Sequence, residues 1–372
     1  MTAVLVALTW IGFVADASRI SKVLPGVLCI LVSGLVLSNL HITPFSSSAA
    51  DFVGQYIVAA AIPLLMIKAD LKKIFVESGR VMIAFAAACI GIVIGVLLGH
   101  FLLQPWHVGA KVAGVYAGGF IGGTISLVAV ANAVQMTASE LSVATGASMI
   151  PSVLGLMSLV ALPNLAIVRR HLRAHREDGQ GVGEAALNAL TLAPEFRLTH
   201  ISGALALSLG ICAVARALEW RVGGWIKHDQ SQYNILYVTT LTVVIANVFP
   251  RQLRVLRGEF ELGMIFMYMF FGVIGLGTNI TSFLASAVSL FFYVLILLGV
   301  GIAVTLVVSS LLRLDLAEAI TGCGAAIVGP VATVAVVAGK GWNSMISPAV
   351  MTGIFCHIVG NFVGITVATL LR

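Results

Sequence analysis

Charged residues are scarce in this chain. Only 10% of its 372 residues are Asp, Glu, Lys or Arg, made up of 21 basic and 15 acidic side chains, whereas soluble domains carry roughly 25%. So few charges cannot cover the surface of a soluble protein of this length, and 59% of the residues are hydrophobic. The composition therefore argues against most soluble enzyme classes and predicts a polytopic membrane protein.

Sequence motifs of catalysis are also missing. No Walker loop, HExxH or GxSxG sequence occurs, so we expect no enzymatic activity and no ATPase domain. The five cysteines show no CxxC spacing and are expected to be small buried side chains rather than disulfides or zinc ligands. The net charge of +6 comes without a basic stripe that contains aromatics, so we expect basic cytoplasmic loops and no nucleic-acid partner.

Long apolar runs recur from one end of the chain to the other. Most are long enough to cross a bilayer core of roughly 30 Å, and lipid leaves the backbone no partners outside the segment, which predicts an all-α protein. The first run lacks a basic n-region and is expected to be a membrane segment rather than a signal peptide. The runs lie near residues 1–16, 23–40, 52–70, 80–104, 110–134, 140–169, 201–218, 233–249, 259–280, 283–312, 316–339 and 343–371.

The two halves of the chain resemble one another. The stretch 119–134 aligns with 325–340 and pairs Gly123 with Gly329, an offset of 206 positions, and an earlier match at Asn39 has an offset of 208. Chance similarity among Ala, Val and Gly is the alternative, but weak internal repetition is expected of secondary transporters. The predicted domains are a first membrane repeat over residues 1–169, a cytoplasmic linker over 170–200 and a second membrane repeat over 201–372.

Basic residues predict how the repeats are oriented. The loop after the third segment is rich in Lys and Arg, whereas its counterpart at 276–286 has none, and the loop at 249–258 is basic where its counterpart at 41–51 is not. Because basic loops stay cytoplasmic, equivalent loops lie on opposite sides of the membrane and the repeats are inverted. Six crossings per half would make the repeats parallel, so we expect an odd number of crossings. Either one segment does not cross, with 201–218 as the candidate, or there is one crossing more than these runs indicate.

Each half carries a Gly-rich stretch inside an apolar segment, Gly118 to Ser126 in the first and Gly322 to Pro330 in the second. Gly and Pro there interrupt a helix and free backbone groups, which is tolerated at membrane depth only around a cavity or inside protein. The start of a half-helix suits an anionic group, and freed carbonyls suit a cation. Close packing of small residues is the alternative, but occurrence in both halves favours a binding site.

These stretches supply the candidate site residues. His357 lies inside the last segment, where a functional role and a hydrogen bond between helices explain it equally well. The side-chain oxygens of Thr124, Ser126, Asn132 and Thr333 are candidate ligands for Na⁺, and no other cofactor is expected. The full set of candidates for binding a solute or an ion is Gly122, Gly123, Thr124, Ser126, Asn132, Gly329, Pro330, Thr333, His357 and Asn361.

Neither Gly-rich stretch contains a charged residue. Proton-coupled antiporters commonly need a buried carboxylate, so the sequence favours a secondary active transporter that moves a small organic anion, coupled to Na⁺ or H⁺. A monovalent cation/proton antiporter that titrates Asp70, Glu261 or His357 is one alternative, although three lysines close to Asp70 favour a solvated segment end. A non-transporting membrane scaffold or sensor is the other.

Several of these stretches resemble the YjcL-like membrane proteins, the family called domain of unknown function 819. The resemblance covers nearly the whole chain from Pro25 onward, and that family is grouped by similarity with the cation–proton antiporter and anion transporter superfamily. The residues that carry it are SNL at Ser38, PLLMIKADL at Pro63, GGFIGGTISLVAVANAV at Gly118, FFGVIGLGTNI at Phe270 and IVGPVATVAVVAGKGWNS at Ile327.

The resemblance implies inverted repeats, discontinuous helices that cross near the membrane midplane, and an elevator-type motion of a core domain against a scaffold. On this chain the crossing positions are Gly122 to Ser126 with Asn132, and Gly329 to Thr333. The lack of a carboxylate there departs from the proton-antiporter branch. The expected partners are a small-molecule solute, membrane lipid and a second copy of the chain, in the cytoplasmic (inner) membrane of a bacterium.

Overall fold

The computed structural model describes residues 1–17, 26–44, 47–69, 71–103, 109–164, 168, 172, 197–223, 234–253, 255–277, 280–340 and 342–371. Within these ranges every regular element is a helix, as the composition predicts. Most of the linker expected at 170–200 lies outside the described residues, as does Asp70.

The helices of the first half of the chain follow the apolar runs closely. The third run is divided by a π-helical turn, and Ser47 caps its first helix by accepting a hydrogen bond from the backbone N–H of Ala50. In order, the elements are α1 (Thr2–Ala17), α2 (Gly26–Asn39), α3 (Ser48–Phe52), the π-helix η2 (Val53–Ile57), α4 (Val58–Met66), α5 (Leu71–Ser78), α6 (Val81–Leu103), α7 (Ala110–Ala133), α8 (Ala138–Ala161) and the 3₁₀ turn η4 (Leu162–Asn164).

The helices of the second half of the chain also follow the apolar runs, except that one run forms two helices. The run expected at 316–339 is two helices, which meet at Val328 and Gly329. The elements are α11 (Leu198–Gly223), α12 (Asn234–Val248), α13 (Pro250–Leu253), α14 (Glu259–Leu276), α15 (Ile280–Leu311), α16 (Leu316–Ile327), α17 (Gly329–Gly339), the 3₁₀ turn η5 (Asn343–Met345) and α18 (Ile346–Leu370).

Eight helical segments among the described residues are long and apolar enough to cross a membrane, which agrees with a polytopic membrane protein. Four further apolar helices, α1, α2, α12 and α16, are shorter. The odd number of crossings and the inversion of the repeats stay predictions. The eight segments are Ser48–Met66, Val81–Leu103, Ala110–Ala133, Ala138–Ala161, Leu198–Arg221, Glu259–Leu276, Val288–Leu311 and Ile346–Leu370.

The chain forms two compact units, and each takes segments from both halves of the sequence. The first unit comprises Met1–Lys68, Ala131–Ser148 and Glu195–Leu290. The second unit comprises Ala69–Val130, Met149–Pro194 and Phe291–Arg372. The two units therefore do not coincide with the two halves of the sequence. The boundaries predicted at 170 and 200 divide the sequence repeats, and these repeats stay a prediction.

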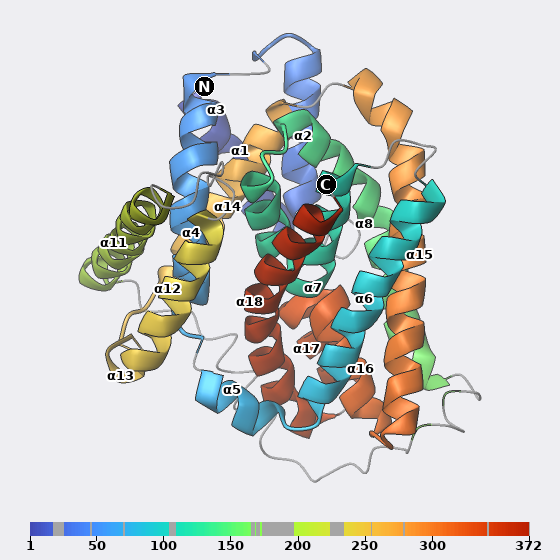
Figure 1. Cartoon of the computed structure of the whole chain (residues 1–372). Coiled ribbons are helices and arrows are strands. Elements are labelled where there is room, and N and C mark those ends of the chain that lie inside the picture. Colours follow the sequence, from blue (N-terminus) through green and yellow to red (C-terminus); the bar gives the residue numbers. More distant parts are fainter. Residues whose placement is uncertain are drawn as a thin grey trace. The chain divides into compact units, whose positions relative to one another are not determined.

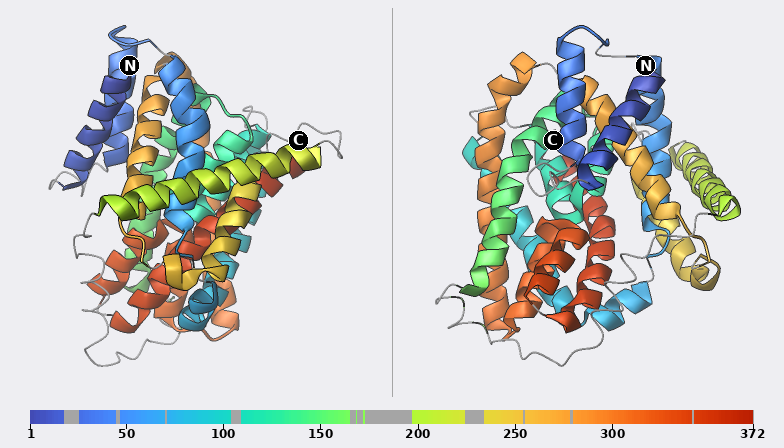
Figure 2. Two further views of the ribbon diagram at one scale, coloured as in Figure 1. Left: turned by 90° about the vertical axis from the view of Figure 1, so that its left-hand side faces the viewer. Right: turned by 180° about the vertical axis from the view of Figure 1, so that it is seen from behind.

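Helix α14 lies at the centre of the first unit, where it contacts α1, α2, α4 and α11 (Figure 1). Gly34 of α2 and Gly275 of α14 bring these two helices together, because a methyl group on Gly34 would lie 2.9 Å from the carbonyl carbon of Gly275. Helix α11 runs across α4 rather than along it (Figure 2). Its buried Ser208 donates a hydrogen bond of 2.6 Å to the carbonyl of Ala60 on α4.

The second unit is built around α6, α16, α17 and α18, which lie side by side (Figure 1). Helices α6 and α16 touch closely, since a methyl group on Gly322 would lie 2.6 Å from the backbone nitrogen of Phe85. The fully buried Tyr293 of α15 donates a hydrogen bond of 2.9 Å to the carbonyl of Val96 on α6. Both Gly-rich stretches belong to this unit, whereas the last residues of α7 belong to the first.

Candidate functional site

Helix α7 is interrupted at Gly123, which has φ 68° and ψ −169°. This backbone conformation is open essentially to glycine alone, and a residue with a Cβ there costs of order 1–3 kcal/mol. Space is not the constraint, because the nearest atom to an added Cβ would be Cε1 of His357, at 3.7 Å. Gly123 is therefore required by the break in the helix and not by close packing.

A second interruption separates α16 from α17 at Gly329. Val328 ends α16 with φ −116°, and Gly329 follows with φ 80°. An added Cβ at Gly329 would have no atom within 4 Å, so its conformation again requires glycine. Gly123 and Gly329 are the two glycines that the sequence pairs at an offset of 206 positions, and the prediction of an interrupted helix at both places is confirmed.

The break in α7 is stabilised from α18. An interrupted helix leaves the last carbonyls of its first half without helical partners, and the ring Nδ1 of His357 lies within hydrogen-bonding distance of the carbonyl of Gly122. Because a carbonyl can only accept, Nδ1 is the protonated ring nitrogen. In return, the buried Ser126 donates a hydrogen bond of 3.0 Å to the backbone carbonyl of His357. Two hydrogen bonds therefore join the two sides of the break to α18.

Small residues form a close seam between α7 and α18. A methyl group on Gly360 would lie 2.7 Å from the carbonyl oxygen of Gly118 and from the Cα of Gly122. Farther along the seam, Gly114 faces Gly364 in the same way. Such contacts are typical of helices that associate in membranes through small residues. Close packing therefore explains Gly118 and Gly122, and it does not explain Gly123.

The other candidates of the second unit have various surroundings. Thr333 is buried and donates a hydrogen bond of 2.7 Å to the carbonyl of Gly329, in its own helix. Thr124 is exposed at the start of the second half of α7. Asn361 is fully buried on α18. Pro330 lies in the first turn of α17, and its side chain is outside the described ones.

Four buried hydroxyl groups of the second unit, those of Ser78, Ser309, Thr321 and Thr352, lack a hydrogen-bond partner among the described residues. Two of them, Oγ1 of Thr321 on α16 and Oγ1 of Thr352 on α18, belong to helices that contact each other, and both side chains are fully buried. Buried polar groups without partners are uncommon in native proteins. These two hydroxyls add unused hydrogen-bonding capacity to the unit that contains both helix breaks.

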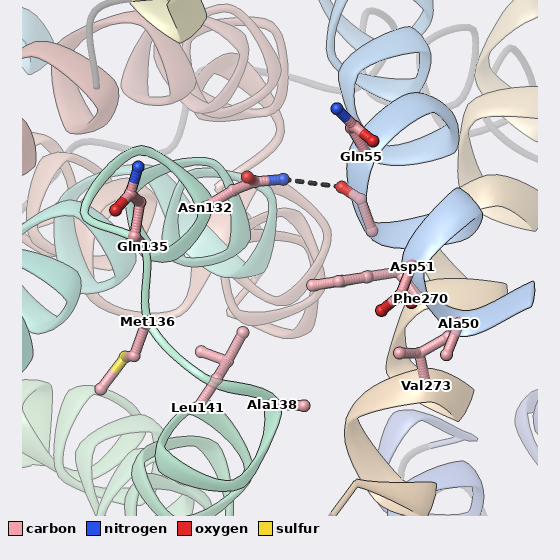
Figure 3. Close-up of a pocket in the computed structure, with 11 residues that line it drawn as sticks. Ala50, Asp51, Gln55, Asn132, Gln135, Met136, Ala138, Leu141, Phe270 and Val273 are labelled. Carbon is pink, nitrogen blue, oxygen red and sulfur yellow. Dashed lines mark hydrogen bonds between the residues drawn. The ribbon is translucent and has the colours of Figure 1, made fainter. Parts of the chain in front are cut away.

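Asn132 belongs to the first unit, where it lines a pocket (Figure 3). The π-helical turn η2 explains the pairing, because the N–H of Val58 bonds to the carbonyl of Val53 instead of that of Gly54. The carbonyl of Gly54 accepts a hydrogen bond of 2.8 Å from the Asn132 side-chain amide. Such turns occur frequently at functional sites. Asn132 therefore belongs to the first unit, whereas Gly123 and Gly329 belong to the second.

We name this cavity the Asp51 pocket. It has a volume of about 420 Å³ and is formed by α3 and η2, by the end of α7 with the start of α8, and by α14. Its lining holds the side chains of Asp51, Gln55 and Gln135, none of which is among the candidates predicted from the sequence. The lining residues are Ala50, Asp51, Gly54, Gln55, Asn132, Gln135, Met136, Ala138, Leu141, Phe270 and Val273.

Of the two carboxylates considered for proton exchange, Asp70 lies outside the described residues and Glu261 belongs to the first unit. Glu261 is half-buried in the first turn of α14, in the first unit. Another acid of that turn, Glu259, is buried, and one of its oxygens lies 2.6 Å from the ammonium nitrogen of Lys68. All five cysteines are free. Cys89, Cys323 and Cys356 are buried as expected, whereas Cys29 and Cys212 are only half-buried.

Comparison with known proteins places these features in one family. The chain is 28% identical to an uncharacterized membrane protein, YjcL, from Bacillus subtilis (strain 168) over 354 residues, which is 91% of this chain and 88% of that protein. The family described as protein of unknown function (DUF819) matches residues 3–372. The match includes both helix interruptions and every residue of the Asp51 pocket, and the chain therefore belongs to the DUF819 family of membrane proteins.

Proposed function

We propose that this protein is a secondary active transporter that moves a small organic anion across the cytoplasmic membrane of a bacterium, coupled to Na⁺ or H⁺. The observation that carries the proposal is the pair of helix interruptions at Gly123 and Gly329, both in the second unit. The second half of an interrupted helix begins with free N–H groups and a partial positive charge. These groups suit a carboxylate, and the freed carbonyls suit a cation.

The side chains near the breaks are compatible with this chemistry. Neither Gly118 to Ser126 nor Gly322 to Pro330 contains a charged residue, so an anionic solute would meet backbone dipoles and hydroxyl groups. The hydroxyls of Ser126 and Thr333 donate their protons to carbonyls and keep lone pairs for a cation. Three of the four proposed Na⁺ ligands, Thr124, Ser126 and Thr333, belong to this unit, and the fourth, Asn132, belongs to the first unit.

The order of the helices supports a repeated architecture. In the first half α2, α4, α6, the interrupted α7 and α8 follow one another, and α12, α14, α15, the interrupted pair α16–α17 and α18 do so in the second half. Basic loops at non-equivalent positions support inversion of one copy relative to the other. We include inverted repeats, an elevator-type motion and a homodimer surrounded by lipid in the proposal.

Reconstituted protein provides the test. Proteoliposomes would receive a panel of small carboxylates under an inward Na⁺ gradient, a pH gradient or no gradient, and uptake would be measured by mass spectrometry. We expect one gradient to drive accumulation of a carboxylate. The variants Gly123→Ala and Gly329→Ala should lower the uptake rate at least tenfold, whereas Gly210→Ala, at an exposed position of α11 with no atom within 4 Å of an added Cβ, should keep it.

Other outcomes would replace the proposal. Dissipation of a pH gradient on addition of Na⁺ or K⁺ alone, with no organic solute, would establish a monovalent cation/proton antiporter instead. If no solute moves under any gradient and the two glycine variants behave like the original protein, the protein is a membrane scaffold or sensor and not a transporter. Each preparation would first be checked for folding by size-exclusion chromatography, so that a loss of uptake is not a loss of protein.

A further inference from the structure

We propose that the Asp51 pocket binds a small organic cation through a primary ammonium group. The pocket lies entirely within the first unit and contains neither of the interrupted positions, Gly123 and Gly329. It is therefore a binding site in addition to the one proposed at the helix breaks, and it does not depend on that proposal.

The charge of the lining determines the sign of the ligand. Among the lining residues that the structure describes, Asp51 is the one charged residue, and none is Lys, Arg or His. The structure gives its carboxylate no hydrogen bond or ion pair within the described part of the chain. An anion would meet this carboxylate without a compensating positive charge, whereas a cation would form a charge-assisted hydrogen bond with it.

The amide of Asn132 shows which polar atoms are available. Its nitrogen donates to the carbonyl of Gly54, and this contact fixes the orientation of the amide because a carbonyl cannot donate. The side-chain oxygen of Asn132 is therefore left to accept from a ligand. Gln55 adds another amide from η2, on the opposite side of the pocket from Asn132 (Figure 3). An ammonium group has three N–H donors, which matches a lining rich in acceptor oxygens.

The remaining lining suits a short hydrocarbon chain. Phe270, Met136, Leu141 and Val273 contribute apolar surface, and an aromatic ring also attracts a nearby cation. The ring of Phe270 lies beside η2, because its Cε2 atom would be 3.8 Å from a methyl group on Gly54. A volume of about 420 Å³ is larger than a bare metal ion needs and falls in the range of roughly 300–1,000 Å³ that is typical of sites for organic molecules.

The test uses the full-length protein in lipid nanodiscs and n-butylammonium chloride as the probe. Binding would be followed by ligand-observed NMR over a titration, at constant ionic strength, with empty nanodiscs as the background. We expect saturable binding of butylammonium and no saturable binding of butyrate, which has the same chain and the opposite charge. The variant Asp51→Asn should raise the dissociation constant at least tenfold.

Matched variants separate a specific site from general electrostatics. Glu140 also lies in the first turn of a helix, but its carboxylate bonds to Thr137 and does not line the pocket, so Glu140→Gln should change the dissociation constant less than twofold. Gln55→Leu should raise it at least threefold, whereas Tyr56→Leu, at an exposed neighbour outside the lining, should not. If Asp51→Asn does not fold, the dissociation constants of Gln55→Leu and Tyr56→Leu are compared instead.

The proposal is overturned if butylammonium shows no saturable binding, if butyrate binds equally well, or if Asp51→Asn and Glu140→Gln weaken binding to the same extent. The measurement needs no ion gradient and no flux. A negative result here therefore leaves the proposed transport untouched, and a failure of transport leaves this binding site standing.

Discussion

The imidazole of His357 donates a hydrogen bond from Nδ1 to the carbonyl of Gly122, directly before the interruption of α7. This contact explains why a histidine lies inside an apolar helix. A role in proton exchange is not needed to explain it. We predict that His357→Leu destabilises the protein by about 1–3 kcal/mol, because the buried carbonyl loses its donor. His357→Asn should cost much less, since its amide nitrogen can take the place of Nδ1.

Thermal unfolding of the purified variants in detergent measures this difference. Equal stability of the Leu and Asn variants would contradict the assigned hydrogen bond. Restored stability in the Asn variant, together with retained uptake in proteoliposomes, would also exclude His357 as the titrating group of a proton antiporter.

Backbone conformation predicts the effect of substituting the interrupting glycines. Gly123→Ala and Gly329→Ala should each destabilise the protein by about 1–3 kcal/mol, because alanine must adopt a positive φ. Gly210→Ala is the control, since it lies in a helix with space around it and should be neutral or stabilising by up to about 1 kcal/mol. The stability of all three variants is measured from their unfolding midpoints in denaturant. If Gly123→Ala and Gly329→Ala are as stable as Gly210→Ala, both helices are continuous.

The seam between α7 and α18 predicts a different kind of loss. Gly360→Ala places a methyl group 2.7 Å from backbone atoms of α7, and overpacking of this kind costs roughly 1–3 kcal/mol. Gly299→Ala on α15 has no atom within 4 Å of the added carbon and should be tolerated. Differential scanning calorimetry distinguishes them, and a Gly360→Ala protein as stable as the Gly299→Ala protein would show that the two helices are farther apart.

The ion pair between Lys68 and Glu259 predicts a charge effect in the first unit. Glu259 is 6% exposed and one of its oxygens has no partner among the described residues, so Lys68→Met leaves a buried carboxylate without its counter-charge. Breaking a fully buried pair costs about 3–5 kcal/mol, and we expect roughly 1–3 kcal/mol here because Lys68 is partly exposed. The double variant Lys68→Met/Glu259→Gln should be more stable than Lys68→Met alone. The opposite order in thermal unfolding would show that the pair contributes nothing.

Most of the helices could be predicted from the sequence, because continuous apolar runs of about 20 residues cross a membrane as helices. The helix breaks were also predictable, since Gly123 and Gly329 each stand in an apolar run at the same place in its half. The hydrogen bond of Asn132 was not predictable, because its partner is the carbonyl of Gly54, which η2 supplies from a distant part of the sequence.

The Asp51 pocket could not be predicted from local patterns. Its walls come from three stretches far apart in the chain, and a π-helical turn leaves no sequence signature of its own. Acidic residues are common in the first turn of a helix, so the sequence around Asp51 predicts only this ordinary role. The role of His357 stayed open for a similar reason, because the carbonyl that it binds is supplied by another helix.

The interleaving of the compact units has a consequence for biosynthesis. The ribosome completes α1 to α8 before it makes α11 to α18, yet both units draw on segments from each of these groups. The first group alone cannot complete either unit. After insertion, its contact surfaces therefore stay exposed to lipid or to a chaperone until the second group has been made. Two fragments separated within 173–196 and produced in the same cell should therefore fold only together.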